Sequence, residues 1–451
     1  MGIPLIADLG RLNTGSRRFL FFIVFNVVSW QCIVGPALIL FARSLDMKPS
    51  LVGLLISFMP LSMLLIGLTV PLVNHYGPKR VMLTGWLLRN VLACAVFLIP
   101  FVRGWGVHYA QYVLIASVLA FCVLRAMGAG GWLPWLLELV SDNQRGAYFS
   151  MEAAVTQLTS VLVALIQALL LTGPPNDWRF LMVFGIGIAA GLISLVWMAL
   201  IPGGGSTRAT VVPEVSHVAY RAAFRDRAFV SFVITAALGY SSLTWLLGSA
   251  LVLYMRDALT LPPGVIMTIT AAGSMGIFLT IASWGRFADY AGSAAAMFWA
   301  MLGHAACAVA CIALVPGAGW TSPVLWSVFV VASVFGAAFN VAANRAMLGY
   351  IRKDRRVVYT NVWSIGTSLA VGLTPIAAGY LIDHFQRGGF YACFALSALT
   401  GVACATLGLR FVREADRESA TITPQTEGQL FSADAATPAP ATATDSSRLA
   451  S

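Results

Sequence analysis

The sequence predicts an all-α membrane protein with twelve transmembrane helices, arranged as two pseudo-symmetric bundles of six. Three features predict this architecture: a very apolar composition, twelve long apolar segments, and a repeat that relates the two halves of the chain. Of the 451 residues, 59% are hydrophobic and only 10% are charged, whereas a soluble domain carries about 25% charged residues. A water-soluble globule of this length is therefore excluded.

Twelve segments are long enough to cross a membrane, for which a helix needs about 20 mostly apolar residues. The expected spans are roughly 19–42, 51–73, 81–102, 110–136, 150–172, 179–201, 229–254, 264–284, 293–315, 322–350, 357–382 and 389–411. The first span is too long for a cleaved signal peptide and lacks a small-x-small site. The expected divisions are a cytoplasmic segment 1–18, a first bundle 19–201, a cytoplasmic linker 202–228, a second bundle 229–412 and a disordered cytoplasmic tail 413–451.

The basic residues set the expected orientation. Fifteen Lys and Arg lie in loops on the side that holds the N-terminus, against six on the other side. Because cytoplasmic loops carry the excess of basic residues, both termini are expected in the cytoplasm, with the chain in the plasma (inner) membrane. The net charge of +10 then reflects topology in a lipid bilayer, and no nucleic-acid partner is expected.

The two halves match each other at an offset of 213 positions. The segment 37–43, which ends in Arg43 and is followed by Pro49, aligns without gaps on 250–256, which ends in Arg256 and is followed by Pro262. Two groups of six helices in the same orientation imply parallel repeats, related by an axis along the membrane normal.

Each half carries part of the pattern Gly-x-x-x-Asp-Arg-x-Gly-x-Arg/Lys-Arg/Lys between its second and third spans. The first copy keeps Gly77, Lys79 and Arg80, and Asn74 replaces the Asp. The second copy, which lacks the basic residues, keeps Gly285, Asp289 and Gly292. This pattern in both loops resembles the signature of the major facilitator superfamily, and the resemblance covers about residues 17–412.

The resemblance implies that these six residues, Asn74, Gly77, Arg80, Gly285, Asp289 and Gly292, gate the cytoplasmic side. We expect Asn74 near the start of the helix at 357–382 and Asp289 near the start of the helix at 150–172. A side-chain oxygen can accept hydrogen bonds from the exposed N–H groups at a helix start. A simple turn is the alternative interpretation of Asn74.

Arg125 lies within the span 110–136 and is followed by glycines up to Gly131. This run resembles the superfamily's Arg-x-x-Gln-Gly-x-Gly signature, with the Gln and the first Gly replaced. An ionisable residue at membrane depth usually faces a cavity or a partner. Arg125 is therefore expected either to bind substrate or to stiffen its own helix. Arg89 and His304 lie in spans that are peripheral in the superfamily, so structural pairing is favoured for both.

The acidic residues avoid the middle of every expected span. Glu152, at the start of the span 150–172, is the best candidate for coupling transport to a proton or another ion. A salt bridge to Arg145 or a favourable charge at a helix start would also explain it. The absence of acids beside Arg125 favours an anionic or neutral substrate over a cation.

Polar residues within the spans are expected to line a substrate path, because helices 1, 4, 7 and 10 line the cavity in the resembling fold. Hydrogen bonds between helices would explain each uncharged residue singly. The expected substrate-binding residues are Asn26, Gln31, Arg125, Gln157, Trp245, Asn340, Asn344, Asn361 and Trp363.

The sequence contains no Walker phosphate loop, zinc-protease motif or nucleophile elbow, so no enzyme activity, metal or cofactor is expected. We therefore predict a monomeric secondary transporter for a small organic solute, anionic or neutral, that works by alternating access. The alternative is a transporter-like membrane protein that acts as an assembly factor or sensor without transport.

Overall fold

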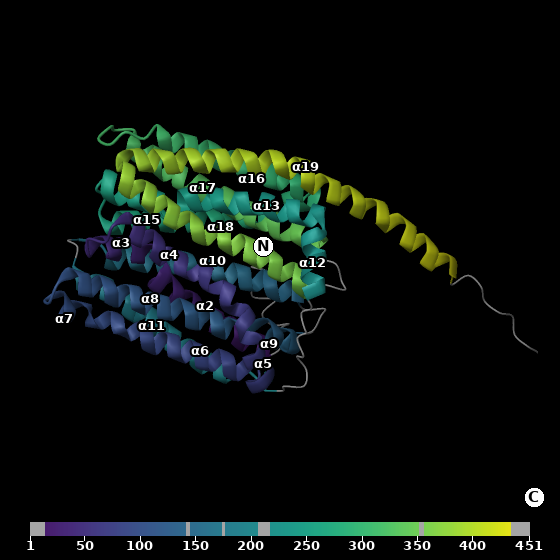
Figure 1. The fold of residues 1–451 in the computed structure, drawn as a ribbon, viewed down its shortest axis with the longest axis horizontal. Helices are drawn as coiled ribbons and strands as arrows, with labels where there is room; N and C mark the ends of the chain where they lie inside the picture. The colour runs from purple at the N-terminus through teal and green to yellow at the C-terminus, as the bar shows by residue number, and fades with distance from the viewer. Residues whose placement is uncertain (1–13, 141–144, 174–175, 206–216, 351–355, 434–451) are drawn as a thin grey trace, which may run out of the picture.

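The computed structural model describes residues 14–140, 145–173, 176–205, 217–350 and 356–433. In these ranges the chain forms helices and no strands, and twelve helices are long and apolar enough to cross a membrane. Figure 1 shows the helices packed lengthwise, with the first half of the chain below the second. The expected fold class is confirmed.

The first half contributes six spans, several of them built from consecutive helical segments. They are α2 (Thr14–Val34) with α3 (Pro36–Ser44); α4 (Pro49–Ser62) with η1 (Met63–Thr69) and α5 (Val70–Tyr76); α6 (Pro78–Ala93) with η2 (Cys94–Leu98) and α7 (Ile99–Arg103); α8 (Val107–Ala129); α10 (Arg145–Leu170); and α11 (Asp177–Ala199). A short helix, α9 (Trp132–Leu139), follows the fourth span.

The second half repeats this arrangement after α12 (His217–Arg225), a short helix in the linker region. Its spans are α13 (Arg227–Leu243) with η4 (Thr244–Gly248), α14 (Ala250–Leu253) and η5 (Tyr254–Ala258); α15 (Pro263–Ala291); α16 (Ser293–Ile312); α17 (Thr321–Tyr350); α18 (Arg356–Phe385); and α19 (Arg387–Ala433). The segments η4 and η5 are π-helical, a form that is rare and concentrated at functional sites.

Glycines set the equivalent turns after the second and the eighth span. Gly77 and Gly292 have φ angles of 81° and 86°, a conformation that a residue with a Cβ adopts only with strain. Pro78 follows Gly77 at the first position of α6, where its missing N–H leaves no helical bond unmade. These two turns lie at one end of the molecule, with residues 200–205, and we call it the linker end. The opposite end, with the loops after Ser44 and Ala258, is the distal end.

The buried apolar residues divide unequally between the two ends. One cluster, which includes Leu38, Phe41, Leu251 and Phe394, joins both halves at the distal end. Toward the linker end the described residues form two separate clusters, one around Phe19 and Trp135 in the first half and one in the second half. The halves therefore share a core only near the distal end.

The C-terminal tail differs from the sequence prediction. Disorder is expected from residue 413, but α19 continues as a helix to Ala433. Adding a residue to an existing helix avoids the cost of nucleation, and this segment contains several Ala, Glu and Arg, which favour helix. The last 18 residues, 434–451, lie outside the described ranges.

Candidate substrate path and gates

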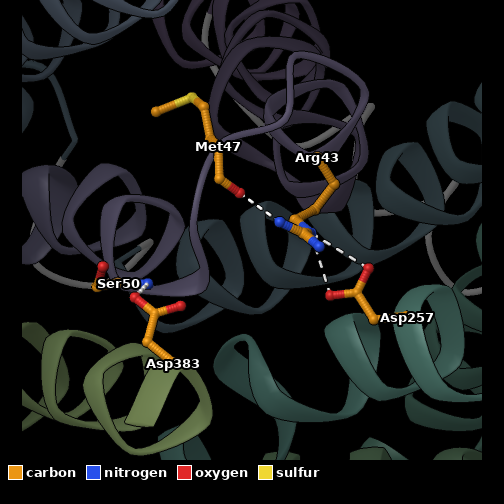
Figure 2. Close-up of polar contacts among 5 residues, drawn as sticks. All are labelled: Arg43, Met47, Ser50, Asp257 and Asp383. Atoms are coloured by element: carbon orange, nitrogen blue, oxygen red, sulfur yellow. Dashed lines mark hydrogen bonds and ion pairs between the residues drawn. The ribbon is translucent and has the colours of Figure 1, made fainter. Parts of the chain in front are cut away.

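An ion pair joins the two halves at the distal end. Arg43, at the end of α3, places its Nε 3.1 Å from both carboxylate oxygens of Asp257 in η5. Figure 2 shows the Arg43 guanidinium between that carboxylate and the carbonyl of Met47, to which it also donates. The two side chains are 24% and 22% exposed, so the pair is partly shielded from solvent and stronger than a surface pair.

Close backbone packing surrounds this ion pair. A Cβ on Gly53 would lie 2.1 Å from the Pro375 carbonyl oxygen, and one on Gly379 would lie 2.3 Å from that of Pro49. These small residues let α4 and α18 approach closely. The Ser50 N–H donates to Asp383 Oδ2 at 3.0 Å between the same two helices (Figure 2). Polar contacts and close packing together seal the distal end.

The contacts of the signature residues at the linker end stay within their own halves, as far as the described residues show. Asp289 lies 3.5 Å from Arg345 of its own half and is 73% exposed. The buried Oδ1 of Asn74 has no hydrogen-bond partner among the described residues. A Cβ on Gly285 would meet nothing within 4 Å, so no neighbouring helix approaches it closely. With the distal end closed, the two signature loops do not bridge the halves.

The first signature loop instead holds the beginning of the linker. Lys79 Nζ donates to the carbonyl oxygens of Ala199 and Ile201 at 2.9 and 2.6 Å. The backbone N–H of Lys79 donates to the carbonyl oxygen of Gly204. An ammonium group at the C-terminus of α11 satisfies free carbonyls and complements the helix dipole. Arg80, in contrast, is exposed and lines a largely apolar groove of about 520 Å³.

Three of the expected substrate-binding residues line one pocket of about 440 Å³. Gln157 comes from α10 in the first half, and Asn340 and Asn344 come from α17 in the second. Asn340 and Asn344 are one helical turn apart and share a face. Asn340 Nδ2 donates to the Gly336 carbonyl at 3.1 Å. Apolar residues such as Leu243 and Ile277 complete the lining, so the pocket combines amide groups with an apolar wall.

Asn26 forms the centre of a polar cluster within the first half. Its Oδ1 accepts from the indole N–H of Trp86 at 3.0 Å and from Arg89 Nη2 at 2.8 Å. The Arg89 guanidinium lies over the rings of Trp86 and Phe121, 4.4 and 4.9 Å from their centroids. Arg89 is 0% exposed, while its Nε and Nη1 have no hydrogen-bond partner among the described residues. The sequence prediction of structural pairing explains only part of this environment.

Arg125 lies on α8, one turn beyond Phe121, and is partly exposed. Its buried Nε has no hydrogen-bond partner, and no carboxylate in the described residues forms an ion pair with Arg125 or Arg89. The desolvation free energy of an unpaired charge buried away from water is on the order of several kcal/mol. The Arg125 Nε therefore does not stiffen its helix by binding a carbonyl oxygen.

The remaining expected site residues have different surroundings. Gln31 donates to the Ser160 hydroxyl and so joins spans 1 and 5. Asn361 donates to the Tyr220 hydroxyl of α12 at 3.2 Å. Trp363 is buried and stacks on Phe232 with ring centroids 5.1 Å apart, inside the core of the second half.

Two further predicted residues are partly exposed. Trp245 lies in the π-helical segment η4 and packs on the distal cluster. Glu152 lies one residue into the fifth span, and its buried Oε2 has no hydrogen-bond partner among the described residues. The structure thus separates the predicted residues into a pocket, a polar cluster and packing positions.

Sequence reasoning missed the residues that close the distal end. Arg43 belongs to the repeated segment 37–43. Its partner Asp257 lies just after the matching segment 250–256, so the repeat does not identify it. A signal was available, because residues of opposite charge end two equivalent spans. No group of three or more His, Cys, Asp or Glu side chains in the described residues is placed to hold a metal ion.

A sequence profile of the Major Facilitator Superfamily matches residues 236–444, and the twelve-helix architecture extends over both halves. The family match covers the second half of the chain, and the first half shares the twelve-helix architecture without matching the family profile. No curated protein matches this sequence.

Solved structures of transporters resemble this chain in fold. A point mutant of the nucleoside transporter NupG aligns with a TM-score of 0.71 at 12% identity, covering 88% of this chain and 100% of that one. An inward-facing bacterial homologue of the iron transporter ferroportin aligns with a TM-score of 0.70 at 13% identity, covering 88% of this chain and 98% of that one. An outward-facing structure of such a homologue aligns with a TM-score of 0.63 at 15% identity, covering 88% of this chain and 99% of that one.

Proposed function

We propose that this protein is a secondary transporter of the major facilitator type that moves a small organic solute by alternating access, and that the structure is its inward-facing form. The division of the apolar core carries the proposal. The halves share one buried cluster at the distal end and have separate clusters toward the linker end. A molecule that is sealed at one end and divided at the other is suited to open toward one side of the membrane.

The orientation in the membrane follows from the basic residues. The linker end carries most of the loop Lys and Arg, which favours the cytoplasmic side for that end and for both termini. The comparisons agree with this assignment, because the inward-facing ferroportin homologue aligns better than the outward-facing one. We therefore assign the distal seal to the periplasmic or outer side of a plasma membrane.

The proposed solute path runs between the halves. Gln157, Asn340 and Asn344 offer amide donors and acceptors from both halves in one pocket, and a solute bound there would contact the two parts that move. In this proposal Arg125 and Asn26, which are both partly exposed, would extend the polar lining into the first half. Glu152 remains the proposed coupling residue, because a partnerless buried carboxyl oxygen is a group that can take up a proton.

In the outward-facing form the signature loops would meet the opposite half. Among the described residues neither Asn74 nor Asp289 bridges the halves here, and Asp289 would exchange its contact with Arg345 for one across the halves. We propose that Asn74 then accepts from the start of α18 and Asp289 from the start of α10. Gly77, Arg80, Gly285 and Gly292 would form the surfaces that come together.

Transport by purified protein in liposomes tests the proposal. A panel of labelled organic acids, sugars and nucleosides is offered under an imposed proton gradient and without one, with protein-free liposomes as a blank. At least one solute should accumulate faster with protein, and Asn340→Leu should reduce its flux at least tenfold, because it replaces a hydrogen-bonding amide of the pocket by an apolar group of similar shape. Thr406→Leu adds an apolar side chain on an exposed face of α19 and should leave flux unchanged. Well-folded protein that moves no solute in the panel would contradict the proposal.

A further inference from the structure

Two guanidinium groups, those of Arg89 and Arg125, lie in the interior of the first half, and no carboxylate of the described residues pairs with either. The Arg89 guanidinium lies 4.9 Å from the ring centroid of Phe121, and Arg125 lies one helical turn beyond Phe121 on α8. The carboxylates of Asp177, Asp257 and Asp289 each pair with another arginine. Two adjacent cations without a counter-ion raise the potential at this point of the membrane, and an anion would lower the energy of the arrangement.

The two arginines are not equivalent in their access. Arg89 is enclosed, fixed by Asn26 and held between two aromatic rings. Arg125 is partly exposed and has no hydrogen bond to any described residue that would fix its guanidinium. Of the two arginines, Arg125 is the accessible one, so a bound anion would contact Arg125 while Arg89 acts on it through its charge.

The unpaired donors also define the chemistry of the ligand. Among the described residues, two nitrogen atoms of Arg89 and at least one of Arg125 find no partner. A guanidinium presents its N–H groups in a planar fork, which matches the paired oxygens of a carboxylate or a phosphate. A neutral solute would leave both charges uncompensated in a membrane interior.

We propose that Arg125, supported by the charge of Arg89, binds the oxyanion group of the transported solute, so that the substrate is an organic anion bearing a carboxylate or phosphate. That the bound anion is the transported substrate rests on the proposed transport function. The anion-binding site itself does not require transport. Arg89 is here a positioning residue, because it acts on the anion through the field and through Asn26.

The test is anion binding by the full chain in detergent, measured by calorimetry and by the thermal unfolding midpoint. The probes are inorganic phosphate and succinate, each compared with chloride at the same ionic strength. A ligand that binds the folded state raises the midpoint in a concentration-dependent way. At least one probe should bind the parent more tightly than chloride does, and Arg125→Gln should weaken that binding at least tenfold.

A second variant removes the charge imbalance without removing an arginine. Asn26→Asp has nearly the same shape and gives Arg89 a carboxylate at the atom that already accepts its hydrogen bond. It should weaken anion binding at least fivefold and raise the unfolding midpoint of the unliganded protein. Arg410→Gln removes an exposed positive charge on α19, and its binding should stay within twofold of the parent.

The outcomes separate cleanly. Binding of phosphate alone or of succinate alone supports the site and names its head group. Equal responses to both probes and to chloride overturn it, and so does unchanged binding in both Arg125→Gln and Asn26→Asp. If anions bind at Arg125 but nothing is transported, the anion site stands and the transport function fails. If only neutral solutes are transported and no anion binds, the transport function stands and the anion site fails.

Discussion

The ion pair at the distal end should control how often that end opens. Replacing Asp257 by Asn leaves Arg43 with the Met47 carbonyl but without a charge partner. The Nε–O distances of 3.1 Å would correspond to roughly 5 kcal/mol of Coulomb attraction at an effective dielectric constant of about 20. Desolvation and side-chain ordering oppose most of this energy, so we expect a net loss of about 1.5 kcal/mol. That shifts the ratio of distal-open to distal-closed molecules about tenfold.

Spin-label distances measure this shift directly. The labels are placed at Trp105 and Trp320, exposed residues next to distal loops of the first and second half, in a Cys94→Ala background because Cys94 is exposed. Asp257→Asn should increase the long-distance population about tenfold relative to the short one. The charge exchange Arg43→Asp with Asp257→Arg should restore most of the closed population.

The chain supplies a matched control for this experiment. Arg103 and Asp177 form an ion pair at the same end, but both residues belong to the first half. Asp177→Asn removes a similar interaction that does not cross between the halves, so the distance distribution should stay that of the parent. The reasoning fails if Asp257→Asn leaves the distribution unchanged, or if Asp177→Asn changes it to the same extent.

Two further substitutions test the packing at each end. Gly53→Ala places a Cβ against the Pro375 carbonyl and should favour the distal-open form by about 1–3 kcal/mol, seen with the same labels. Gly67→Ala, in the same span but with nothing within 4 Å, should have no effect, and an equal shift would refute the argument. Lys79→Met removes the cap of α11 and should lower the free energy of unfolding by about 1–2 kcal/mol, measured by thermal denaturation. Arg80→Met removes an exposed charge and should change stability little; similar losses in both variants would count against capping by Lys79.

The sequence predicts the helices well because membrane spans follow from local composition. Twenty apolar residues suffice to identify a span, and the glycine turns at Gly77 and Gly292 follow from the signature pattern. The continuation of α19 to Ala433 was not predicted, since a polar segment shows no apolar periodicity whether it is helical or disordered.

The arrangement of polar residues was predicted only in part. Asn340, Asn344 and Gln157 share a pocket, whereas Trp363 packs in a core. One-dimensional pattern cannot separate these cases, because a polar or aromatic residue within a span satisfies either role. Among the described residues, Asn74 and Asp289 make no contact across the halves. In an alternating-access transporter one sequence specifies two conformations, and a single structure represents only one of them.

The distal ion pair also bears on the symmetry of the repeat. The offset of 213 residues places Arg256 at the position of Arg43 and Asp257 at the position of Ser44. Two identical copies of the first half would therefore offer an arginine and a serine from each side, with no carboxylate to join them. The second half carries both charges, Arg256 and Asp257, whereas the first half carries the arginine alone. The repeat is therefore asymmetric at the distal end, because the carboxylate of the ion pair can come only from the second half.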